Sequence, residues 1–173
     1  MKYIIFVLLL VFSGCSTLEV NVDYDEAYNF NEQKTYSINR EFKDGENSLF
    51  IDRVKKAINM NLEAKNYKQI TSSQADFIVT FNAKVENKTS TYTDYQMVGM
   101  GRYRYGGAMI STTSSYNYDD GTLVIDVINP KTKKIVWRGV GQAEVQQQDT
   151  PSEKQKYLNE IVTKIMEKFP AKK

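Results

Sequence analysis

The sequence predicts an α+β fold, a two-layer sandwich in which an antiparallel β-meander sheet carries two amphipathic helices on one face. Two segments have apolar residues at helical spacing, whereas several others alternate apolar and polar residues. Turn residues separate most of the alternating segments from one another. Because each of these elements is apolar on one side only, they are buried best when both helices cover the same sheet face.

The first half of the chain is expected to hold two strands and a helix. Residues 18–24 alternate apolar and polar side chains and predict a strand, and residues 35–38 predict a shorter extended segment. Turn and capping residues at 44–48 precede a helix predicted over about 48–65. The apolar residues that indicate this helix are Ile51, Val54, Ile58 and Leu62.

The second half is expected to supply the other strands of the meander. Residues 76–86 predict a strand whose odd-numbered side chains face the core. Asp120-Gly121 predicts a two-residue hairpin turn between two further strands. The next turn is expected at 129–133.

The last turn also predicts the register of the strands beside it. A three-residue loop at 131–133 places Asp126 opposite Arg138, as an ion pair on the sheet face away from the helices. Trp137 then faces inward, and we expect it to share one core with Phe77 beneath the two helices.

The last helix is predicted from residue 151 to about 168. Thr150-Pro151-Ser152-Glu153 has the pattern of a capping box, with proline at the first helical position. The residues after it form one apolar stripe, which consists of Leu158, Ile161, Val162, Ile165 and Phe169.

The N-terminus has the pattern of a secretory signal. Lys2 precedes an unbroken apolar run from Tyr3 to Phe12, which is followed by small residues. A membrane-spanning helix needs roughly 20 apolar residues, so this shorter run favours a signal over a retained span. We therefore interpret residues 1–14 as a signal peptide and residues 15–173 as one domain.

The end of this signal resembles the lipobox of bacterial lipoproteins. Ser13 and Gly14 stand directly before Cys15, the single cysteine of the chain. The resemblance implies that Cys15 is acylated and tethers the domain to membrane lipid. The residue after it is Ser16 and not Asp, which in Gram-negative lipoproteins implies the outer membrane, with the domain facing the periplasm. An ordinary secretory signal followed by an accidental cysteine is the alternative.

The mature chain resembles a bacterial lipoprotein family known as domain of unknown function 4136. The segments that carry the resemblance are Val22-Asp23-Tyr24, Ala75-Asp76-Phe77-Ile78-Val79, Gly121-Thr122-Leu123-Val124-Ile125, Asn129-Pro130-Lys131-Thr132-Lys133-Lys134, Val136-Trp137-Arg138-Gly139 and Phe169-Pro170. The resemblance implies an envelope lipoprotein fold. It implies no catalytic residue.

Composition excludes several classes of function. The chain has no histidine, which removes the commonest general base and the commonest metal ligand. Its 23 basic and 21 acidic residues are interspersed and give a net charge of +2, so nucleic acid is not expected as a partner. We expect no metal and no cofactor.

A Tyr/Gly-rich hairpin insertion at about 92–118 is the candidate binding surface. It holds six of the 12 tyrosines and four of the nine glycines. Its centre alternates Arg102, Tyr103, Arg104 and Tyr105, a mixture typical of adaptable binding loops. The plainer alternative is a hairpin tip whose tyrosines merely cover the sheet.

Three functions remain open. The leading hypothesis is a non-enzymatic, outer-membrane-anchored module that binds an envelope protein or peptidoglycan. The second is an accessory structural subunit of a larger envelope complex. The third is a hydrolase that uses carboxylates alone, with Asp23 and Asp25, or Asp119 and Asp120, as the acid–base pair.

Overall fold

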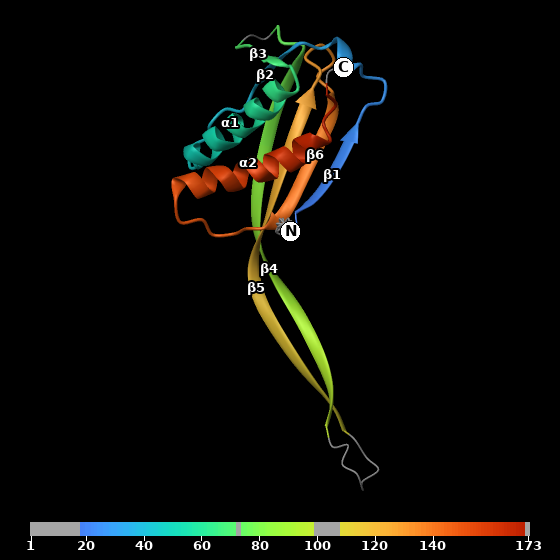
Figure 1. Ribbon diagram of the computed structural model, residues 1–173, viewed down its shortest axis with the longest axis vertical. Helices are drawn as coiled ribbons and strands as arrows, with labels where there is room; N and C mark the ends of the chain where they lie inside the picture. The colour runs from blue at the N-terminus through green and yellow to red at the C-terminus, as the bar shows by residue number, and fades with distance from the viewer. Residues whose placement is uncertain (1–17, 72–73, 99–107, 172–173) are drawn as a thin grey trace, which may run out of the picture.

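A sheet and two helices form the body of the protein, and a long two-stranded arm leaves it (Figure 1). The computed structural model describes residues 18–71, 74–98 and 108–171. The helices are α1 (Ser48–Ala64) and α2 (Pro151–Glu167), and both lie on the same face of the sheet in Figure 1. The strands are β1 (Glu19–Tyr24), β2 (Thr35–Ile38), β3 (Lys68–Gln69), β4 (Phe77–Val98), β5 (Ala108–Ile128) and β6 (Ile135–Glu144).

The sheet is mixed, so the expected antiparallel meander is wrong as a description of the whole sheet. The described strands have the order β1-β6-β5-β4-β2-β3. β1, β4, β5 and β6 pair antiparallel, whereas β2 pairs parallel with both β3 and β4. The reason is the helix between them: α1 carries the chain back to the starting end of the sheet, so the next strand runs in the same direction as β2.

The hairpin turn predicted at Asp120-Gly121 is also wrong. β5 runs straight through this dipeptide, and Gly121 pairs with Val85 on one side and Ala143 on the other. Gly121 has no positive φ. A Cβ atom there would lie 2.9 Å from Val145 Cγ2, so the glycine serves close packing rather than chain reversal.

Both helix starts agree with their predicted caps. The Asn47 side chain accepts a hydrogen bond from the Phe50 backbone N–H at 3.1 Å. At α2, Thr150 Oγ1 accepts from the Glu153 backbone N–H at 3.2 Å, and the Glu153 carboxylate accepts from the Thr150 backbone N–H at 3.0 Å. The capping box is therefore complete.

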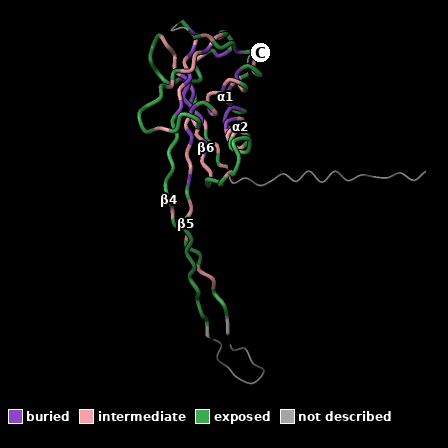
Figure 2. The backbone as a smooth tube through the Cα atoms, turned by 90° about the vertical axis from the view of Figure 1, so that its left-hand side faces the viewer, coloured by how far each residue is buried: buried purple, intermediate pink, exposed green. Residues whose placement is uncertain are grey.

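The core lies between the sheet and the helices, as Figure 2 shows. Trp137 and Phe77 are both fully buried, which confirms that they share one core. Phe169, just after α2, joins them: its ring centroid lies 5.1 Å from that of Trp137, at 90°, and 6.0 Å from that of Phe77.

The predicted register of β5 and β6 is confirmed at Asp126 and Arg138, but it does not continue to the turn, because an irregularity after Val127 shifts the pairing and places Ile128 opposite Ile135. Asp126 pairs with Arg138, and Val127 pairs with Trp137. Arg138 Nε and Nη2 donate to the two carboxylate oxygens of Asp126 at 2.6 and 2.8 Å. Because the neighbouring Val127 is buried in the core, this ion pair lies on the face away from the helices.

Candidate functional site

The arm consists of the outer parts of β4 and β5. Their pairing is regular from Ile78 and Ile128 to Val98 and Ala108. The neighbouring strands end early, because β2 pairs with β4 only as far as Val79 and β6 pairs with β5 only from Asp120 inward. At about 3.4 Å per residue, the part beyond Asp120 extends about 40 Å from the body.

The outer edges of the arm carry unpaired backbone groups. In the body, Val79 O accepts from Asn39 N at 2.8 Å, and Phe81 O accepts from Arg40 Nε at 2.9 Å. On the other strand, Asp119 O accepts from Val145 N at 2.7 Å. Odd-numbered residues of both strands thus point their backbone groups outward. By the alternation of an antiparallel ladder, the same holds for odd residues along the arm.

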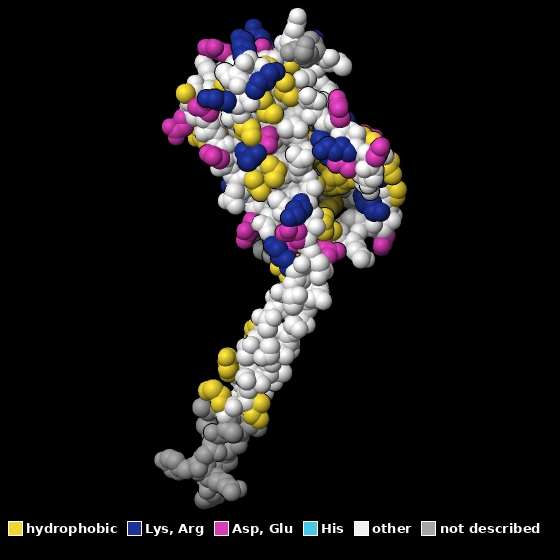
Figure 3. Space-filling view, turned by 180° about the vertical axis from the view of Figure 1, so that it is seen from behind, with side chains coloured by type: hydrophobic (Ala, Val, Ile, Leu, Met, Phe, Trp, Pro, Cys, Tyr) yellow, Lys and Arg dark blue, Asp and Glu magenta, His cyan; other side chains and the backbone are white. Residues whose placement is uncertain are grey.

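The side chains of the arm lack the usual protection of a sheet edge. Residues 89–98 and 108–118 contain one charged residue, Asp94, and no proline. Natural edges are commonly blocked by lysine, proline or bulges. Large apolar side chains are instead exposed on the described part of the arm: Tyr92 67%, Tyr95 66%, Met109 67%, Ile110 52% and Tyr116 59%. Figure 3 shows hydrophobic side chains gathered near its far end.

A polar cluster ties the arm to the body on the face away from the helices. The Asp120 carboxylate accepts from Lys88 Nζ, and it accepts from Gln142 Nε2 at 2.6 Å. Asp120 is 7% exposed. The hydrogen bonds from Lys88 and Gln142 lower the pKa of Asp120, and the carboxylate raises the pKa of Lys88. Three strands are therefore joined where the arm begins.

The carboxylates considered for hydrolysis do not converge. Asp25 accepts from the Ala27 backbone N–H at 2.9 Å, and Asp119 accepts from Asn87 Nδ2 at 3.0 Å. In the strand register, Asp23 of β1 lies opposite Arg138 of β6, which in turn lies opposite Asp126 of β5. Asp119 and Asp120 are neighbours on β5, so their side chains point to opposite faces of the sheet, and Asp120 already accepts from Lys88 and Gln142. Within the described ranges, no group of three acidic or cysteine side chains is placed to hold a metal ion.

The predicted site residues lie outside the described residues. These are the lipidation site Cys15 and the candidate loop residues Arg102, Tyr103, Arg104 and Tyr105. The described parts of the 92–118 insertion belong to β4 and β5. Sequence reasoning missed the arm's free edges. The available signal was a long run with β-prone Thr and Tyr and almost no charge, on both sides of the glycines.

These features define a class of protein: a single α+β domain whose central hairpin extends far beyond its sheet. The chain belongs to the family described as domain of unknown function DUF4136, whose model matches residues 20–171. No curated protein sequence matches the chain. In the part of the chain that the structure describes, no helix is long and apolar enough to cross a membrane.

Solved structures share the fold at low sequence identity. A PDZ domain protein from Parabacteroides distasonis aligns with a TM-score of 0.57 and 11% identity over 91% of this chain, which spans only 36% of the length of that protein. A DUF4136 family protein from Bacteroides thetaiotaomicron has a TM-score of 0.50 and 15% identity, covering 89% of this chain and 96% of its own. A PelC dodecamer from Paraburkholderia phytofirmans has a TM-score of 0.50 and 8% identity, covering 86% and 94%.

Proposed function

We propose that this protein is a non-enzymatic lipoprotein of a Gram-negative outer membrane, which binds another envelope component through its β4–β5 arm. Cys15 carries the lipid, and the domain faces the periplasm. The signal-like residues 1–14 and the lipobox-like Ser13-Gly14-Cys15 support the anchor. Two or three acyl chains hold a protein on a membrane stably, whereas one chain binds only marginally.

The unprotected edges of the arm are the observation that carries the binding role. A two-stranded ribbon alone is marginally stable in water, because each strand pairs on one side only. An added strand from a partner would pair with the outward N–H and C=O groups of the odd-numbered residues. The exposed Tyr and Met side chains would then supply the contacts that make such pairing specific.

A second candidate is the accessory structural subunit of a larger envelope complex, and one form of such a complex is an assembly of copies of this chain. The similar fold of PelC occurs in a dodecamer. Edge pairing between identical arms would build an assembly of this kind, because each arm has two free edges and can contact two neighbours.

Proline substitution at outward-facing positions tests the binding role. Thr91→Pro on β4 and Ser115→Pro on β5 each remove a backbone N–H that the hairpin itself does not use. We expect the amount of partner recovered from crosslinked envelopes to be at least tenfold lower with the double variant than with the parent protein. The matched control, Thr91→Ala with Ser115→Ala, keeps both N–H groups and should recover the partner as the parent does.

The same recovery from the proline variant and the parent would refute edge pairing. A protein that recovers no stoichiometric partner in either form would refute the binding role itself. If the partner recovered is the chain itself, the accessory-subunit candidate is the correct one.

A further inference from the structure

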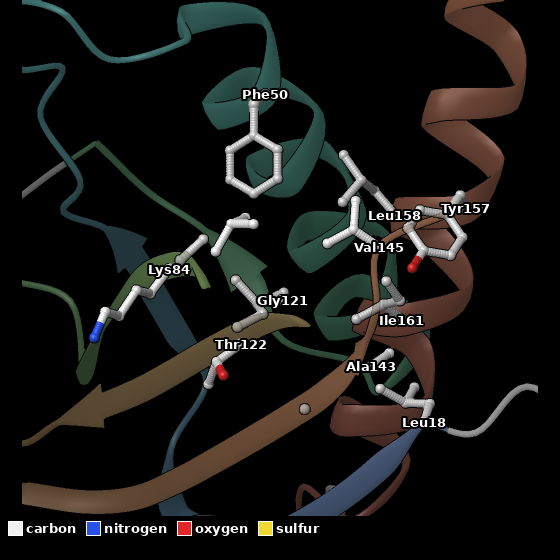
Figure 4. A pocket seen from close by; sticks show the side chains of 14 residues that line it. Leu18, Phe50, Lys84, Gly121, Thr122, Ala143, Val145, Tyr157, Leu158 and Ile161 are labelled. Carbon is white, nitrogen blue, oxygen red and sulfur yellow. The ribbon is translucent and has the colours of Figure 1, made fainter. Parts of the chain in front are cut away.

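An apolar groove lies at the open end of the helix–sheet interface, next to the base of the arm (Figure 4). Its volume is about 230 Å³. Phe50 of α1 and Leu158 and Ile161 of α2 form its walls, and Val85 and Val145 stand at its mouth, 60% and 38% exposed. We call this hollow the basal groove.

The groove exists because the sheet beneath it carries small residues. Along β4, the inward side chain changes from the buried Phe81 to Ala83, and along β5 it changes from Ile125 and Leu123 to Gly121. Gly141 and Ala143 of β6 complete the floor. A Cβ atom on Gly141 would lie 2.6 Å from Ile165 Cδ1, so a larger residue does not fit there without displacing α2.

The groove offers almost no polar group to an occupant. The Tyr157 hydroxyl donates to Glu144 O at 3.1 Å. The ring of Tyr157 therefore lines the groove, while its hydroxyl group already has a hydrogen-bond partner outside it. The ammonium of Lys84, at the rim, pairs with the Glu86 carboxylate. An occupant therefore needs an apolar chain and no hydrogen-bonding group at this depth, which describes an acyl chain better than a peptide.

The N-terminal end of the described chain is part of the groove. Leu18 lines it, and Glu19 then begins β1 opposite Gln142. A smaller hollow of about 30 Å³ shares Leu18, Ala143, Tyr157 and Ile161 with the groove and continues it along α2. Three peptide units separate Leu18 from Cys15, so their Cα atoms are at most about 11 Å apart.

We propose that the basal groove holds one acyl chain of the lipid on Cys15, an inference that rests on the proposed acylation of that residue. An acyl chain spans about half of the roughly 30 Å hydrocarbon core of a bilayer, about 15 Å, which exceeds the distance to be bridged. An apolar cavity of about 150 Å³ takes up benzene, so by the same volume per carbon this groove holds on the order of nine carbons. One acyl chain thus lies in the groove while the other chains of the lipid hold the protein on the bilayer.

Photocrosslinking tests this occupancy in the full chain. Cells that express the protein are fed a palmitate analogue with a diazirine on its chain, irradiated, and the protein is purified and digested. We expect the label on Cys15 to form intramolecular links to peptides that contain residues 141–145 or 157–161. Ala83→Phe fills the floor from an exposed position and should lower these links at least tenfold.

Asn82→Phe is the matched control, because it places the same ring on the opposite face of the same strand and should leave the links unchanged. Near-UV circular dichroism of the buried Trp137 checks that each variant is folded. If Ala83→Phe does not fold, Val85→Glu puts a carboxylate at the mouth from a position that is 60% exposed and should lower the links in the same way.

The outcomes distinguish a failure of the groove proposal from a failure of the proposed acylation of Cys15. A protein labelled on Cys15 whose links go only to membrane lipids, or whose groove links persist in the folded filling variant, overturns the groove and leaves the anchor standing. A protein that takes up no label overturns both the anchor and the groove.

Discussion

Single residues determine how closely α2 approaches the sheet around Trp137. Gly139 lies on the helix-facing side of β6, where a Cβ atom would be 2.3 Å from Trp137 Cη2 and 2.5 Å from Ile165 Cγ2. Both neighbours are fully buried and have no free space to move into. The absence of a side chain at residue 139 is therefore a packing requirement of the core.

We expect Gly139→Ala to destabilise the protein by about 1–3 kcal/mol, because the added methyl group forces Trp137 or α2 to move. Urea unfolding followed by the fluorescence of this tryptophan measures the change. Gly121→Ala is the control: its Cβ would come too close to the end of the partly exposed Val145, at 2.9 Å, and would lie at an ordinary contact distance of 3.6 Å from Ala143 O, so it should cost less. Equal losses for the two variants would show that the close approach at Gly139 is relieved in solution.

Asp76 gives the protein a pH-dependent contribution to stability. Its Oδ2 atom accepts from the backbone N–H groups of Lys34 and Thr35, both at 2.8 Å, and from Thr35 Oγ1 at 2.9 Å. Desolvation raises the pKa of Asp76, but these hydrogen bonds outweigh it and lower the pKa below the ordinary 3.8. The stabilisation is present above pH 3.8 and is lost as the pH falls through the lowered value.

Asp76→Asn should therefore destabilise the protein at neutral pH, and the difference from the parent should shrink as the pH falls below 3.8. Urea unfolding at a series of pH values measures the two curves. Asp44→Asn, at an exposed loop position, is the control and should follow the parent curve. A difference that stays constant down to acidic pH would mean that the charge of Asp76 is irrelevant to its role.

At the scale of elements, the sequence predicts what local residues decide. The capping box at Thr150 and Glu153 and the turn at 129–133 depend on neighbours a few positions apart, and both occur as predicted. The continuity of β5 and the direction of β2 depend on distant strands. Asp120-Gly121 has the sequence of a turn, but in the structure it lies in a strand between β4 and β6. There the missing side chain of Gly121 leaves room for Val145.

In the candidate site too, some features follow from neighbouring residues and others depend on distant strands. A run rich in Thr and Tyr with little charge, such as 89–98, favours a strand, but whether its edges are paired depends on where β2 and β6 end. The basal groove needs Ala83, Gly121 and Gly141 on three adjacent strands, and their shared position follows from a register that spans much of the chain. Periodicity in one segment does not contain this information.

The arm is expected to contribute little to the stability of the body. Replacing residues 89–117 by Asn-Gly joins Lys88 to Tyr118, which pair in the parent, through a two-residue turn. Because the described strands of the removed part pair only with each other, we expect the melting temperature to change by less than about 3 °C, on the order of 1 kcal/mol for a domain of this size. Calorimetry measures the change, and a fall of more than about 10 °C would assign the arm a structural role in the body.

At the scale of the whole molecule, the anchor decides where the protein resides. We expect Cys15→Ala to abolish labelling by a fatty-acid probe and to move the protein from the detergent phase to an uncleaved or aqueous form. Detergent partitioning and probe labelling measure the two effects. Ser16→Ala is the control, since it leaves the acylated atom in place, and labelling of the Cys15→Ala variant at the parent level would disprove the anchor.

The starting point of β1 limits how the proposed lipoprotein can sit on its membrane. Glu19 stands in one row with Gln142 and Thr122, directly beside the base of the arm, so tether and arm leave the same end of the body. The arm reaches about 40 Å while the tether from Cys15 allows about 11 Å. Since unpaired backbone cannot enter hydrocarbon, an anchored molecule must lie with its arm along the lipid surface. Its search for a partner is then confined to two dimensions, where even a weak edge contact is favoured by the high effective concentration of neighbours in the same leaflet.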